Sequence, residues 1–127
     1  MPLAGLLGIE AVSETAQEVR ARLAWRDDLC TAGGVMHGGV LMALADCAGG
    51  VCAYLNLPAG ATGTATIQSS TNFLRPVRDG YVEAVSRPLK VGRTVIVIET
   101  EIVDAEGRGV AHIAQSQAVL LEPAGSS

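Results

Sequence analysis

The feature that most constrains this fold is an almost unbroken apolar stretch at residues 33–55, GGVMHGGVLMALADCAGGVCAYL. On length alone it could span a bilayer. A helix that is apolar on all sides lies either in a membrane or inside its own protein. Asp46, two glycine pairs and the amphipathic segments that follow argue against a membrane. We therefore expect one long central helix, enclosed by the rest of the chain, and no membrane partner.

The remaining segments are typical of half-buried strands, because apolar and polar residues alternate along them. Val19, Ala21, Leu23 and Trp25, for example, share one face of their strand. Pro88 indicates an edge position or a bulge in its strand. The predicted strands are a short one at 8–12 and longer ones at 18–25, 64–74, 81–91, 94–103 and 110–121.

This order of elements predicts an α+β fold in a single domain, residues 1–127. The last four strands are expected to form a meander. A curled antiparallel sheet of five to six strands would then wrap around a helix that is roughly 30 Å long. The polar tail at 122–127 is expected to be disordered.

Composition argues against several classes of function. A net charge of −4 and an aromatic content of 3% argue against a nucleic-acid partner. Three cysteines, Cys30, Cys47 and Cys52, favour reduced thiols over a disulfide framework, and their spacing predicts no metal site. The first twelve residues lack the basic region of a signal peptide. We therefore expect a cytoplasmic protein.

Asp46 is the exception within the apolar stretch, and an enclosed carboxylate costs several kcal/mol unless it is paired. No lysine or arginine occurs between Arg26 and Arg75 to pair with it locally. His37 is nine residues away, so a regular helix would place it on the opposite face and about 13.5 Å along the axis. We favour a base or nucleophile at Asp46. The alternative is a structural carboxylate held by backbone N–H groups or hydroxyls.

The predicted helix starts near His37-Gly38-Gly39, where the first N–H groups have no acceptor within the helix. Glycine lets a substrate oxygen approach those groups, as in an oxyanion site. The alternative is that the glycines only permit tight packing. Gly38 and Asp46 lie about 12 Å apart along the helix, too far to act on one carbonyl. Two antiparallel helices in a C2 dimer would bring one copy of each together.

Four short motifs recur in the order of a known family. They are Gly34-x-x-His37-Gly38-Gly39, Asp46, Asn72-Phe73-Leu74-Arg75-Pro76 and Gly92-Arg93-Thr94. From about Gly5 to Leu121 the chain resembles the hot-dog fold acyl-CoA thioesterases of the phenylacetyl-CoA thioesterase-like (PaaI-type) group. The resemblance implies a homodimer joined edge to edge through its sheets, often paired into a dimer of dimers. It implies an acyl-CoA substrate and no further cofactor.

The resemblance also implies roles for individual residues. The N–H of Gly38 would polarise the thioester carbonyl, and Asp46 of the opposing subunit would act as general base or nucleophile. Thr66 would hold the attacking water or Asp46 through its hydroxyl, and His37 would shape the helix entry. Thr31 stands where the family often has Asn, so its shorter side chain puts rate and substrate range in question.

The expected substrate-binding residues lie at the start of the helix and in the segments that come after it in the sequence, where several are positively charged. Some of these charges would meet the phosphates of coenzyme A, although a solvated rim is the alternative for any one of them. The candidates are Gly39, Asn72, Arg75, Lys90 and Arg93.

Three hypotheses follow from these residues. The first is hydrolysis of an acyl-CoA thioester, with a medium-chain or aryl acyl group favoured by the apolar lining. The second is a non-catalytic acyl-CoA-binding hot-dog protein, for which Thr31 is the main support. The third, a hot-dog hydratase or dehydratase, needs aspartate and histidine to act on one substrate, and the nine-residue spacing of His37 and Asp46 argues against it.

Overall fold

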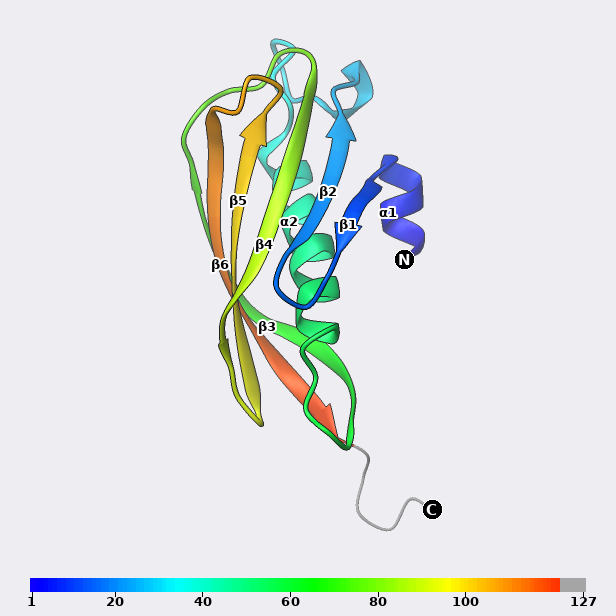
Figure 1. The fold of residues 1–127 in the computed structure, drawn as a ribbon. Helices are drawn as coiled ribbons and strands as arrows, with labels where there is room; N and C mark the ends of the chain where they lie inside the picture. The colour runs from blue at the N-terminus through cyan, green and yellow to red at the C-terminus, as the bar shows by residue number, and fades with distance from the viewer. Residues whose placement is uncertain (122–127) are drawn as a thin grey trace.

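A computed structural model describes residues 1–121, and within them a six-stranded antiparallel sheet curls around helix α2 (Figure 1). This confirms the expected α+β architecture. The tail prediction, 122–127, lies outside the described residues. The elements are α1 (Pro2–Leu7), β1 (Glu10–Glu14), β2 (Val19–Ala24), the 3-10 turn η1 (Asp27–Leu29), α2 (Gly38–Tyr54), β3 (Ala61–Phe73), β4 (Tyr81–Val91), β5 (Val95–Asp104) and β6 (Gly109–Leu121).

The strand order is β1-β2-β4-β5-β6-β3, so the expected four-strand meander is wrong. Of the four strands after α2, β4, β5 and β6 are neighbours in chain order, whereas β3 pairs with β6 from Ala61↔Leu121 to Phe73↔Ala111. The chain leaves β3 beside the start of β6, where the N–H groups of Leu74 and Arg75 both donate to the carbonyl of Val110. It then passes β6 and β5 to begin β4, and β3 is left as an edge strand.

Strand β3 contains a bulge that sets which of its side chains face the helix. Thr66 is opposite Gln117, but Gln68 is opposite Ser116, so Ile67 is the extra residue. Thr66 and Phe73 are seven positions apart, and a regular strand would place them on opposite faces. The bulge reverses the alternation between them. Both therefore lie on the side of α2.

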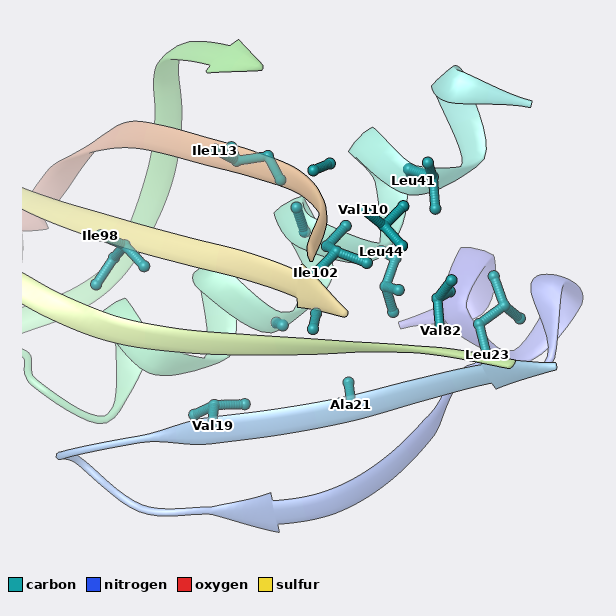
Figure 2. Close-up of a cluster of buried hydrophobic side chains, with 14 of the residues drawn as sticks. Val19, Ala21, Leu23, Leu41, Leu44, Val82, Ile98, Ile102, Val110 and Ile113 are labelled. Carbon is teal, nitrogen blue, oxygen red and sulfur yellow. The ribbon is translucent and has the colours of Figure 1, made fainter. Parts of the chain in front are cut away.

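The core lies between the concave face of the sheet and one side of α2 (Figure 2). Leu41, Leu44, Ala45, Ala48 and Cys52 form the helix side of this core. Facing them, inward-pointing residues alternate along the strands, as the period of two requires. The main strand residues of the core are Val19, Ala21, Leu23, Val82, Ala84, Ile96, Ile98, Ile102, Ala111 and Ile113.

The helix is not enclosed on all sides, which corrects the expectation from its apolar sequence. Gly39, Met42, Asp46 and Tyr54 are exposed and recur at helical spacing, so they share one open face. The sheet reaches only the opposite side of α2. Among residues 1–121 no helix has the length and apolar character to cross a membrane.

Smaller differences concern the ends of elements. Helix α1 was not predicted, and β3 begins three residues earlier than expected. Pro88 lies at another bulge, between Pro88 and Lys90 of β4. It also lies beyond Ser86, the last residue of β4 that pairs with β2. Both features of the prediction for Pro88 are therefore present.

Candidate active site

Helix α2 begins at Gly38 because His37 caps it. The backbone of His37 is extended, with φ −63° and ψ 133°, and its ring Nδ1 accepts a hydrogen bond from the Gly39 N–H at 2.8 Å. An accepting Nδ1 requires the neutral ring with its hydrogen on Nε2. The N–H groups of Val40 and Leu41 donate to the His37 carbonyl. Within residues 1–121 this leaves the Gly38 N–H without an acceptor at the positive end of the helix dipole.

The surroundings of Gly38 form a cavity of about 440 Å³. A Cβ at Gly38 would lie 2.9 Å from the tip of the Phe73 ring, so packing also favours glycine here. Thr31 and Arg75 line this cavity together with Gly38, so the fold brings three of the predicted site residues to the helix start. Gly39 adjoins them, but its N–H is already bonded to His37.

Asp46 lies two turns further along α2, and its partners are neutral polar groups. Its Oδ1 accepts a hydrogen bond from the Thr66 hydroxyl at 2.8 Å and another from Nε2 of Gln115 at 3.1 Å. Gln117 donates through its Nε2 to the Thr66 hydroxyl at 2.7 Å. Asp46 is exposed in the single chain, so the expected burial of this carboxylate is wrong. The contact between Asp46 and Thr66 is the one that the resemblance implied.

A second cavity, of about 610 Å³, opens at Asp46 and Thr66. Cys47 also lines it and is a possible rival nucleophile. Burial and the neighbouring charge of Asp46 raise the pKa of the Cys47 thiol, and burial raises the pKa of Cys52 to about 11. A protonated thiol is a poor nucleophile. Asp46 is therefore the better candidate for the reacting group in this cavity.

The two cavities are separate within one chain. Of the residues that the structure describes, none lines both of them. Gly38 and Asp46 stand on one regular helix, so about 12 Å of helical rise separates them. One chain thus holds a free N–H donor in one cavity and a hydrogen-bonded carboxylate in the other. A single thioester cannot meet both.

The remaining predicted binding residues lie away from these cavities in the single chain. Asn72 is exposed and points to the face of β3 opposite Phe73. Lys90 is exposed near the end of β4. Arg93 lines a different cavity, of about 380 Å³, with Pro58 and Thr94. Their role in binding coenzyme A stays a prediction.

Gln115 and Gln117 are site residues that the sequence reasoning missed. Both are buried, with 1% of their surface exposed. They lie two apart on β6, a spacing that puts them on one face of a strand. The sequence signal that could have revealed them is the presence of two amides on the buried face of a mostly apolar strand.

The thioesterase superfamily matches this chain over residues 33–111, more than half of its length. ComA2 of Bacillus subtilis is 31% identical over 80% of this chain and 81% of its own length. The 1,4-dihydroxy-2-naphthoyl-CoA hydrolase of Escherichia coli is 35% identical over 59% of this chain. The matched segment spans about half of that hydrolase, 54%, and 59% of a relative from Thermoplasma volcanium that is 33% identical.

Solved structures agree with the family match. A thioesterase from Haemophilus influenzae superposes with a TM-score of 0.90 at 27% identity, over 98% of this chain and 87% of its own. The PaaI protein of the E. coli phenylacetic acid degradation operon superposes with a TM-score of 0.85 over 94% of this chain and 85% of its own. At 20% identity this second likeness shows the fold alone. The chain therefore belongs to the thioesterase superfamily and has the hot-dog fold, as its motifs implied.

Proposed function

We propose that this protein hydrolyses the thioester of an acyl-CoA to a free acid and coenzyme A, working as a homodimer. The proposal rests on the observation that the two groups needed for the reaction lie apart in one chain. The free N–H of Gly38 and the oriented carboxylate of Asp46 lie in separate cavities of one chain. Membership of the thioesterase superfamily supports the reaction type.

The open face of α2 and the edge strand β3 support a two-fold dimer. Strand β3 is 13 residues long, and residues 65–70 are exposed along it. A long exposed edge offers unpaired N–H and C=O groups to another strand. Two β3 edges that paired antiparallel would place the open faces of two α2 helices side by side. Gly38 of one subunit would then face Asp46 of the partner subunit.

In the proposed reaction the thioester oxygen accepts a hydrogen bond from the Gly38 N–H, and the helix dipole stabilises the negative charge that develops there. Asp46 of the partner subunit takes a proton from water while the water oxygen bonds to the acyl carbon. The C–S bond then breaks, coenzyme A leaves with the electron pair as a thiolate, and the proton that Asp46 took passes to the thiolate sulfur. Direct attack by Asp46, followed by hydrolysis of the resulting anhydride, uses the same carboxylate. Thr31 and Arg75 lie on the Gly38 side, where they could meet the carbonyl and a phosphate.

A third cavity gives an indication of the acyl group. It has a volume of about 150 Å³ and lies among α1, β1, β2 and α2. Met1, Cys47 and Val51 line both this cavity and the one at Asp46, so the two adjoin. A mostly apolar cavity of that volume holds a group of about the size of benzene. We therefore favour an aryl or short acyl group, and the aromatic substrate in the name of the E. coli relative supports this choice.

The test is release of free thiol from a panel of aryl and alkyl acyl-CoAs, followed by Asp46→Asn. This substitution keeps the shape of the side chain and removes its basicity, so kcat should fall by at least about a hundredfold. Asp79→Asn, an exposed aspartate in the loop before β4, is the matched control and should keep full turnover.

The second candidate, a non-catalytic acyl-CoA binder, has the short Thr31 side chain in its favour. It predicts thermal stabilisation by acyl-CoA with no thiol released by the wild-type protein. That result would exclude hydrolysis. Full turnover by Asp46→Asn would remove Asp46 from the mechanism while leaving the reaction in place.

A further inference from the structure

Two buried glutamines of β6 contact the Asp46–Thr66 pair, and the reaction proposed above gives them no role. Gln115 and Gln117 are each 1% exposed. Gln115 donates to Asp46 at 3.1 Å, and Gln117 donates to Thr66 at 2.7 Å. Burying a primary amide is unfavourable unless its polar atoms are bonded. The reason for keeping two amides in this place must therefore come from what they bind.

Gln117 fixes the direction of the hydroxyl hydrogen of Thr66. Its Nε2 can only donate, so the Thr66 oxygen is the acceptor in that contact. The single hydrogen of the hydroxyl is then free to point to Oδ1 of Asp46, 2.8 Å away. Oδ1 accepts a second hydrogen bond from Gln115. Within residues 1–121, Oδ2 accepts none. The carboxylate is thus held by one oxygen and leaves the other free to react.

Gln115 occupies its position at a cost to the fold. Its Oε1 is buried and has no hydrogen-bond partner within residues 1–121. That oxygen lies against Gly49, where any Cβ would collide with it. Turning the amide over would put Oε1 against the Asp46 carboxylate, and two acceptors repel one another. An apolar side chain of the same size would avoid the unpaired oxygen. The gain from the amide is therefore its contact with Asp46.

We propose that Gln115 and Gln117 are positioning residues, which hold Asp46 through Oδ1 so that Oδ2 is the reacting oxygen. Gln115 acts on the carboxylate directly, and Gln117 acts through Thr66. This inference rests on the proposed function of Asp46, and it names the atom that takes the proton from water or attacks the acyl carbon.

The first test is Gln115→Met, which keeps an unbranched side chain of similar length and removes the amide. We expect kcat to fall by up to about a hundredfold because the carboxylate is no longer held in place. KM should change little. The melting temperature should stay the same or rise, since the unpaired Oε1 is gone. Gln17→Met, at an exposed turn position, is the control and should change neither kcat nor KM.

The second test is a double-mutant cycle on kcat with Gln117→Met and Thr66→Val. Each substitution alone should lower kcat. Because Gln117 acts through the Thr66 hydroxyl, Gln117→Met should have no further effect once Thr66 is Val. Independent effects that multiply in the double variant would overturn the role of Gln117. If Gln115→Met does not fold, this cycle still tests whether hydrogen bonds from β6 hold Asp46, through Gln117 and Thr66.

These outcomes separate the inference from the function on which it rests. Wild-type turnover together with unchanged kcat in Gln115→Met would overturn the positioning role and leave the hydrolase proposal intact. A lower melting temperature with unchanged kcat would show a packing role for Gln115. An inactive wild-type protein would overturn the proposed function itself, before any glutamine is changed.

Discussion

At the scale of single residues, His37 shows how a motif residue can shape the proposed site through one hydrogen bond at the helix start. Its Nδ1 occupies the N–H of Gly39, and this hydrogen bond starts α2 at Gly38. The neighbouring N–H of Gly38 is thereby left free for a substrate. The histidine thus determines which N–H of the helix start is available.

We expect His37→Ala to lower the free energy of unfolding by about 1 kcal/mol, the usual effect of losing an N-cap. Turnover should fall as well, because the helix start is no longer fixed. His37→Asn supplies a side-chain oxygen that caps well and should restore most of both. Urea unfolding and steady-state kinetics check the two effects. If Asn abolished turnover as fully as Ala does, the ring itself would be needed and the capping role would be insufficient.

The residues of the site differ in how far the sequence reveals them. Asp46 is identifiable because it is the single charge in an apolar stretch, and the HGG motif marks the helix start. The exposure of the Asp46 carboxylate was not predictable, since an exposed carboxylate and an enclosed one have the same local sequence. Gln115 is 69 positions from Asp46, and only the packing of β6 against α2 brings it near. Thr66 was found through the family resemblance alone.

At the scale of elements, the positions of the strands in the sequence were largely predictable, but their pairing partners in the sheet were not. Alternation marked β2, β4, β5 and β6 to within one or two residues. It could not show that β3 crosses to the far side of β6, because the choice of partner depends on edges that lie far apart in the chain. Nor does alternation reveal that Ile67 is an extra residue in β3. Helix α1 is six residues long and buries no residue, so it leaves no periodic signal.

The bulge at Ile67 gives a test at this scale. Deleting Ile67 alone would leave Thr66 and Phe73 six positions apart, so a regular strand would keep both facing α2. Deleting Ile67 together with Gln68 would leave them five positions apart and on opposite faces, so we expect this double deletion to lose turnover and thermal stability. The single deletion should keep the sheet and most of the turnover. Kinetics and circular dichroism of both variants check this, and an active double-deletion variant with an intact sheet would contradict it.

At the scale of the whole molecule, the single chain has the two parts of the proposed site but cannot join them. Asp46 is exposed, the α2 face around it is open, and the Gly38 N–H belongs to another cavity. A second copy related by a two-fold axis explains all three features together. It would cover the open face and set each carboxylate opposite the partner subunit's helix start.

Dimers that combine a Gly38 variant with Asp46→Asn test this arrangement. The Gly38 variant must first be shown to lose the N–H group without other damage. Gly38→Pro removes the N–H while suiting the first position of a helix, and Gly38→Ala adds a Cβ but keeps the N–H. Both must displace the tip of the Phe73 ring, so their difference isolates the hydrogen bond. We expect Gly38→Pro to be the less active of the two by at least about tenfold.

When Gly38→Pro is unfolded and refolded with Asp46→Asn, half of the dimers should be mixed. Each mixed dimer has one site with both changes and one site with neither. Turnover should therefore recover to about a quarter of the wild-type value, although each variant alone is inactive. If Gly38 and Asp46 acted within one chain, every site would keep one damaged group and mixing would restore nothing. Turnover of the mixture, with a size measurement of each species, distinguishes these cases because only a shared pocket can be rebuilt from two defective chains.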